Sequence, residues 1–324
     1  MRQALVRFAA TILLLALSVA VSAQPVARVY RIGFVHSLSS GTSTSLAAFR
    51  EGLKEHGYVE GKNLIIEARF ADGRNDRLPE LLDELLRLKV EVLLAAAPAA
   101  ALAAKRATTS VPVVFAGVAD PVGRGLVQSL ARPGGNVTGI GGILTSAKLV
   151  ELLKEAVPGV SRVALLSDRA EPLNAQVVAQ MQEGARSLML KLDVYDAGNA
   201  VDLDRALAAI DANGADGIVV TSAPFLFTNR ARIADFAVRK RLPAVQPSRQ
   251  FAEAGGLVAY GSSLEWSYRR AAAHVDRIFK GAKPADLPVE QPTHFELVIN
   301  LKTARAIGLK IPPSLLLRAD HIIE

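Results

Sequence analysis

The chain has 324 residues, half of them hydrophobic, with a formal net charge of +7 and no cysteine. This length allows one large domain or two medium ones with an ample core. The lack of cysteine excludes disulfides, thiolate nucleophiles, cysteine-ligated metals and a lipoprotein anchor, and the scattered basic residues give no support for nucleic-acid binding.

The N-terminal segment has the organisation of a secretory signal peptide. Arg2 and Arg7 precede the apolar run Phe8–Val21, and Val21-Ser22-Ala23 supplies a small-x-small cleavage site. We expect residues 1–23 to be removed and the mature protein to lie in a Gram-negative periplasm, without a lipid anchor. The alternative is an uncleaved N-terminal anchor, although about 14 apolar residues are short for a span that needs about 20.

The first half of the chain alternates between segments that predict strands and segments that predict helices. In chain order these are strand Tyr30–His36, helix Ser45–His56 stopped by Gly57, strand Asn63–Phe70, helix Asp76–Leu88 capped by Asp76, strand Val90–Ala95, helix Ala99–Ala107 with Pro98 in its first turn, and strand Val111–Ala116. Strands separated by helices of this length indicate βαβ units and a parallel sheet.

The same pattern recurs in the second half. Its members are strand Ser161–Ser167, helix Asn174–Leu188, strand Lys191–Tyr195, helix Val201–Ala212, strand Gly217–Thr221, helix Asn229–Lys240 and strand Leu242–Gln246. The duplicated order predicts an α/β protein with two doubly wound parallel-sheet lobes.

Two glycine-rich segments predict the connections between the lobes. Arg132–Gly142 suits a crossover between lobes, and Glu253–Ser263 follows the second half. The helix Leu264–Lys280 and the strand-like Phe295–Leu301 then indicate that the chain crosses back, so that two or three crossings form a hinge. We expect residues 28–143 plus 262–284 to form lobe 1, and residues 144–261 plus 285–324 to form lobe 2.

Residues at the carboxyl ends of the strands are the candidate ligand contacts, because ligands of open parallel sheets bind there. Asp120 and Pro121 stand where the buried run from Val113 should end and a helix should begin. Asp120 is suited to cap that helix, to face a ligand amine, or to do both. The hydroxyl-rich loop His36–Ser45 could offer backbone N–H groups and hydroxyls to a carboxylate, or be a polar loop without that role.

The complete set of candidate contacts comes from the ends of both groups of strands. It consists of His36, Ser39, Ser43, Ala97, Pro98, Gly117, Asp120, Asp168, Ser222, Phe225, Ser248, Tyr260 and Ser262. Phe225 and Tyr260 could cover an apolar part of a ligand or pack within the fold. No catalytic motif, cofactor motif or metal-ligand spacing is present, and the five histidines are dispersed.

Long stretches of the chain match positions in a known protein family. They are Ala48–Ala95, Asp120–Ile140, Glu253–Gly261 and Lys280–Asp320. They resemble the tryptophan/tyrosine-type family of bacterial ABC-transporter substrate-binding proteins.

The resemblance implies a type I periplasmic-binding fold with several crossovers. It also implies a monomer that captures a small ligand, aromatic or amino-acid-like, and delivers it to an ABC permease in the inner membrane, without enzymatic activity or a cofactor. The match at Asp120-Pro121-Val122 supports a ligand-amine role for Asp120. At Ala96-Ala97-Pro98 the chain lacks the hydroxyl residue that often precedes this proline in the family.

Two other functions fit a bilobal α/β chain of this kind. One is a ligand-sensing protein for a membrane receptor. The other is a bilobal enzyme, although two-lobed amino-acid racemases use paired cysteines that this chain lacks.

Overall fold

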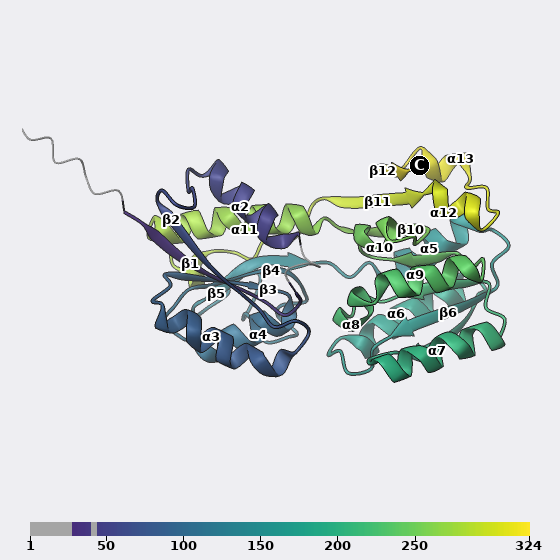
Figure 1. The fold of residues 1–324 in the computed structure, drawn as a ribbon, viewed down its shortest axis with the longest axis horizontal. Coiled ribbons are helices and arrows are strands. Elements are labelled where there is room, and N and C mark those ends of the chain that lie inside the picture. The colour runs from purple at the N-terminus through teal and green to yellow at the C-terminus, as the bar shows by residue number, and fades with distance from the viewer. Residues whose placement is uncertain (1–27, 40–43) are drawn as a thin grey trace, which may run out of the picture.

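The computed structural model describes residues 28–39 and 44–324, whose strands form two separate sheets side by side along the molecule (Figure 1). The expected signal peptide, residues 1–23, lies outside the described residues. No helix in the described ranges is long and apolar enough to cross a membrane.

The first sheet has five parallel strands in the order β2-β1-β3-β4-β5. They are β1 (Tyr30–His36), β2 (Leu64–Phe70), β3 (Val92–Ala96), β4 (Val113–Ala119) and β5 (Val137–Gly142). Because successive side chains of a strand point to opposite faces, Ile32 and Phe34 of β1 join one apolar cluster and Val35 joins another.

Helices cover both faces of this sheet (Figure 1). On one face lie α2 (Ser45–Glu55) and α11 (Leu264–Phe279), and on the other lie α3 (Leu78–Arg87) and α4 (Pro98–Ala107). The short 3₁₀ helices η3 (Asn75–Arg77) and η4 (Pro284–Asp286) complete this lobe. Thus a helix from late in the sequence completes the first lobe.

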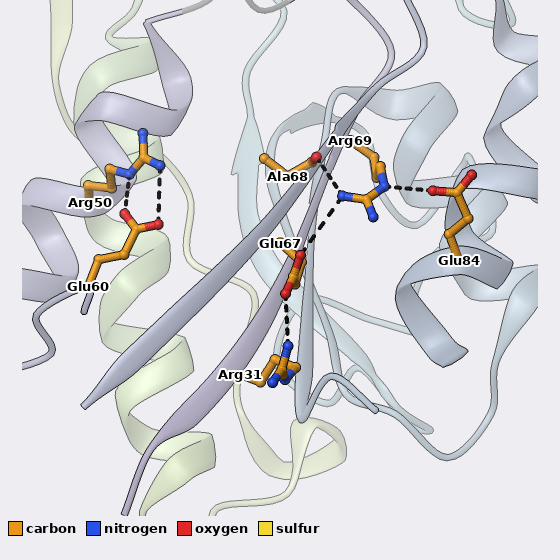
Figure 2. A network of polar contacts seen from close by, with 7 residues as sticks. All are labelled: Arg31, Arg50, Glu60, Glu67, Ala68, Arg69 and Glu84. Carbon is orange, nitrogen blue, oxygen red and sulfur yellow. Dashed lines mark hydrogen bonds and ion pairs between the residues drawn. The ribbon is translucent and has the colours of Figure 1, made fainter. Parts of the chain in front are cut away.

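Charged side chains of the edge strand β2 form ion pairs with neighbouring elements of this lobe (Figure 2). Glu67 accepts a hydrogen bond from Arg31 at 2.8 Å, and Arg69 donates to Glu84 at 2.7 Å. Both pairs are partly exposed to solvent, and ion pairs near the surface contribute only about 0–1 kcal/mol each. Charged side chains on an edge strand nevertheless disfavour pairing with another chain.

The second sheet has seven strands in the order β12-β11-β10-β9-β8-β6-β7. They are β6 (Arg162–Ser167), β7 (Lys191–Asp196), β8 (Gly217–Val220), β9 (Ala244–Gln246), β10 (Val258–Ser262), β11 (Phe295–Asn300) and β12 (His321–Ile323). The pair β10 and β11 is antiparallel, and all other neighbouring strands are parallel.

Helices also cover both faces of the second sheet. On one face lie α5 (Ser146–Ala156), α6 (Asn174–Ser187), α12 (Leu301–Ala306) and α13 (Pro313–Leu316). On the other lie α7 (Ala200–Ala212), α8 (Pro224–Thr228), α9 (Arg230–Arg239) and α10 (Arg249–Glu253). The prediction of two doubly wound α/β lobes is therefore confirmed.

The chain passes between the lobes three times. The crossings follow β5, β10 and residue 290, and the last one leads into β11. Residues 287–290, which the sequence analysis assigns to the second lobe, hydrogen-bond to the first. Val289 N donates to Leu130 O at 2.8 Å, and Glu290 N donates to Gly139 O at 3.1 Å. We therefore propose lobe boundaries with the last crossing after Glu290 instead of after residue 284.

The prediction that Arg132–Gly142 is a crossover is wrong, because Val137–Gly142 forms β5 of the first sheet. Three glycines leave this strand few apolar side chains to signal it. One of them, Gly139, has a φ of 154°, and a Cβ there would lie 2.1 Å from the carbonyl oxygen of Phe115. Close approach of the neighbouring strand therefore requires glycine.

The prediction that Asp76 caps a helix is also wrong. Asp76 lies within η3, and its carboxylate accepts a hydrogen bond from Arg74 at 3.1 Å. The α-helix begins two residues later, at Leu78, with a proline in its first turn and no side-chain cap. The proline at the first turn sets the start of the helix.

Candidate ligand-binding cavity

An interlobe cavity of about 250 Å³ lies at the carboxyl ends of strands from both sheets. The first lobe contributes residues that end β1, β3 and β4, and the second contributes residues that end β8, β9 and β10. This volume is near the lower end of the roughly 300–1,000 Å³ that is typical of small-molecule sites. Its location is the one expected for a ligand of parallel α/β sheets.

Seven of the residues predicted from sequence line this cavity. They are His36, Ala97, Pro98, Gly117, Ser222, Ser248 and Ser262. Five others, namely Ser39, Asp120, Asp168, Phe225 and Tyr260, are not among the lining residues. Ser43 lies outside the described residues.

Asp120 points back to its own turn. Its backbone has a positive φ of 46°, and its Oδ1 accepts a hydrogen bond from Gly123 N at 2.9 Å. Residues 121–125 form a turn and not a helix, so the expected helix start is wrong. The carboxylate therefore stabilises a local turn, as aspartate commonly does.

The other three acidic or aromatic candidates also have local partners. Asp168 accepts a hydrogen bond from Ala170 N at 2.9 Å. The ring of Tyr260 stacks on that of Phe295 with centroids 5.9 Å apart. Phe225 packs against the core beneath α8, whereas its neighbour Phe227 lines the cavity. The rotation of one short helix decides which of the two aromatic rings reaches the cavity.

His36 lines the cavity as a neutral ring. Leu38 N donates a hydrogen bond to its Nδ1 at 2.9 Å, which leaves Nε2 as the nitrogen that carries the proton. Burial lowers the pKa of His36 from 6.5 to about 4, since the charged form loses its solvation. The ring can therefore donate one hydrogen bond from Nε2 near neutral pH.

The start of α4 faces the cavity through Ala97 and Pro98. Ala97 has a φ of 77°, a left-handed conformation that is costly for a residue with a Cβ. The first backbone N–H groups of a helix have no partner within it. This end of the cavity is therefore suited to an acceptor group, despite the missing hydroxyl residue before the proline.

Two buried polar atoms beside the cavity have no hydrogen-bond partner among the described residues: Ser37 Oγ and Gln246 Nε2. Both residues line the cavity and are about 1% exposed. Gln246 is oriented by Ser248, whose hydroxyl donates to its Oε1 at 2.6 Å. Leaving such groups unpaired costs about 1–3 kcal/mol each, so they indicate a site built for a polar ligand.

Two charged side chains, Arg124 and Glu171, line the cavity in the described part of the chain, one from each lobe. Burial lowers the pKa of Arg124, and burial raises the pKa of Glu171. Each shift is opposed by the charge of the other residue across the cavity.

In residues 28–39 and 44–324, no group of three histidine, aspartate or glutamate side chains could hold a metal ion.

Sequence reasoning missed Ser37, Arg124, Glu171 and Gln246 as individual contacts. Glu171 lies in the loop after β6, and the sequence favours Asp168 because that residue directly follows the strand. Arg124 lies just past the Asp120 turn, which folds back and presents it. A usable signal was the charged residues of two loops that follow buried strands, Arg124 after β4 and Glu171 after β6.

Comparison with known proteins places the chain among transport proteins. A family model described as "ABC transporter substrate binding protein" matches residues 38–323. A tyrosine-binding protein of Clostridioides difficile (strain R20291) is 22% identical over 262 residues, which cover 81% of this chain and 76% of that protein.

Two solved structures share the fold. A conserved domain protein from Vibrio cholerae has a TM-score of 0.85 and 26% identity, with 91% of this chain and 100% of that chain covered. An ABC domain from Streptococcus pneumoniae in complex with L-Trp has a TM-score of 0.84 and 24% identity, with the same coverage.

Proposed function

The chain belongs to the family of ABC transporter substrate binding proteins, and on that premise we propose that it captures a small ligand in the interlobe cavity for an ABC importer. Its two lobes have the fold of type I periplasmic binding proteins, and it is a binding protein, not an enzyme. An ABC permease in the inner membrane would receive the ligand.

The proposed ligand is aromatic or amino-acid-like. Two relatives are described as a tyrosine-binding protein and as a complex with L-Trp. The cavity supports this class because apolar residues, among them Leu149, Met181 and Phe227, line it together with several polar side chains. A mostly apolar pocket with a few placed polar groups is typical of small-molecule sites.

The proposed location is the periplasm, which the monomer would reach through the signal peptide of residues 1–23. N-terminal sequencing of the exported protein tests this, and a first residue other than Gln24 would contradict the cleavage site.

Once bound, the ligand would draw the lobes together about the three crossings, in the hinge closure known for such proteins.

The observation that carries the proposal is a cavity lined from both lobes, with Ser37 Oγ and Gln246 Nε2 unpaired beside it. It is tested by thermal unfolding of the chain from Gln24 onward with amino acids, aromatic acids, sugars and nucleosides. A ligand at a hundred times its dissociation constant adds about 2.7 kcal/mol of stability. We expect a clear rise with aromatic or amino-acid-like compounds.

Ser37→Ala shows whether the ligand occupies this cavity. Without ligand, we expect its stability to be unchanged or higher, because an unpaired buried hydroxyl is removed. With ligand, we expect a smaller rise than in the wild type. Ser187→Ala, at an exposed position on α6, is the control. If the ligand raises the stability of Ser37→Ala as much as that of the wild type, the ligand binds elsewhere.

The ligand panel has its own contradicting outcome. If no compound raises the stability of protein that mass spectrometry shows to be free of ligand, the capture role is contradicted.

A further inference from the structure

Arg124 and Glu171 face the interlobe cavity from opposite lobes. Arg124 follows β4 of the first sheet, and Glu171 follows β6 of the second. Both side chains are partly buried. The cavity thus has a positive group on one wall and a negative group on the other.

Neither charge forms a salt bridge among the described residues, although Arg124 is attracted by the charges of Glu171 and Asp120. Arg124 donates from Nε to Ala119 O at 3.0 Å, and its two terminal nitrogens have no partner among the described residues. The Glu171 carboxylate has no hydrogen bond or ion pair within the same residues. Partly buried charges without an ion-pair partner lower the stability of the protein. Burial accordingly lowers the pKa of Arg124 and raises the pKa of Glu171, which in both cases favours the neutral form. Opposite charges on a ligand would remove this cost.

The remaining acidic candidates are already engaged. Asp120 accepts from Gly123 N, and Asp168 accepts from Ala170 N, so both carboxylates serve their own loops. His36, which also lines the cavity, is neutral near pH 7. Charge recognition in the cavity therefore falls to Arg124 and Glu171.

We propose that Arg124 and Glu171 select a dipolar ligand, with its anionic group against the Arg124 guanidinium and its cationic group against the Glu171 carboxylate. This rests on the proposed function and gives Glu171 the amine-binding role that the family resemblance supported for Asp120. The apolar part of the ligand lies between the two charges, against the wall that includes Phe227. Because the charges belong to different lobes, one ligand bridges both.

The test uses ligands that differ by one charged group, measured by isothermal titration calorimetry. The probes are L-tryptophan and L-tyrosine, their decarboxylated amines tryptamine and tyramine, and the deaminated acids 3-indolepropionate and 3-(4-hydroxyphenyl)propionate. The wild type should bind the amino acids more tightly than either set of singly charged analogues.

The two variants should then show a crossed pattern. Glu171→Gln should weaken binding of the amino acids and amines about tenfold or more and leave the acids within about threefold. Arg124→Gln should weaken binding of the amino acids and acids and spare the amines. The surface changes Glu183→Gln and Arg132→Gln are the matched controls. Urea unfolding of each variant shows whether it folds.

Three results would overturn the inference. Equal weakening of all six probes would mean that the pair acts on lobe closure and not on ligand charge. Equal binding of amino acids and singly charged analogues by the wild type would reject a dipolar ligand but leave the proposed capture of a small ligand intact. Binding of none of the probes, nor of any compound in the thermal panel, would reject both proposals.

Discussion

At the scale of single residues, the buried side chain of His36 makes the stability of the protein depend on pH. Its side chain is 4% exposed, and burial lowers its pKa to about 4. Between pH 4 and 6.5, His36 is therefore protonated in the unfolded chain and neutral in the folded protein. Stability rises with pH in such a window and falls as the pH drops.

We expect this histidine to cost the protein about 2 kcal/mol of stability when the pH falls from 7 to 5. The measurement is urea unfolding of the wild type and His36→Gln at both pH values. The variant should lose less stability than the wild type over this interval. His321→Gln, at an exposed position on β12, should behave as the wild type does. Identical pH profiles for the wild type and His36→Gln would show that His36 does not carry the effect.

Residue identity at the strand ends was only partly predictable from the sequence. Ser222, Ser248 and Ser262 were expected at the cavity because they follow strands, and they line it. Asp120 also follows a strand, but its side chain bonds to Gly123 N. Chain position fixes which loop a residue occupies, whereas the local turn decides where its side chain points.

At the scale of elements, the contact between α2 and α11 holds the first lobe together. Gly52 of α2 lies so close to α11 that a Cβ there would be 2.4 Å from the backbone carbonyl oxygen of Arg269. The two helices come from distant parts of the sequence, yet they share one face of the sheet (Figure 1). The glycine makes this close approach possible.

Gly52→Ala should therefore destabilise the protein by about 1–3 kcal/mol, because a backbone must move to admit the methyl group. Gly184→Ala is the matched control, since that glycine is also inside a helix and its Cβ would be 3.5 Å from the Ala147 Cβ. The control should gain about 0.5–1 kcal/mol from its better helix propensity. Urea unfolding measures both values, and an unchanged Gly52→Ala would contradict the close packing.

Elements with a regular hydrophobic pattern were predictable, and elements without one were not. The strand Tyr30–His36 and the helix Leu264–Phe279 lie close to their expected ranges. The sequence predicts a crossover at the strand Val137–Gly142 because glycines replace most of its apolar side chains. Its place in the sheet comes from hydrogen bonds to β4, which a local pattern does not show.

At the scale of the whole molecule, three crossings join the lobes, and the only tryptophan of the chain lies beside two of them. Trp266 is in the first turn of α11, just after the crossing from β10. Its ring centroid is 5.6 Å from that of His294, which lies on the crossing into β11. Trp266 therefore reports on the relative position of these segments.

Hinge closure on a ligand should change the emission of Trp266. We expect a shift in intensity or wavelength when L-tyrosine is added and excitation at 295 nm selects the protein tryptophan. Trp266→Phe should lose the signal and keep its affinity in calorimetry. Bound L-tyrosine with unchanged Trp266 emission would contradict movement at these crossings.

The sequence by itself determined the alternation of strands and helices, the two α/β lobes and the membership of a binding-protein family. These follow from hydrophobic periodicity and from long stretches that match the family, and both are patterns of residues that are close together in the sequence. The tertiary structure decided which polar groups meet in the cavity. Arg124 and Glu171 belong to different lobes, and they line the same cavity because of how the sheets are placed and how the loops turn. Charges that meet only after folding leave no common local pattern, so packing, and not sequence spacing, defines this site.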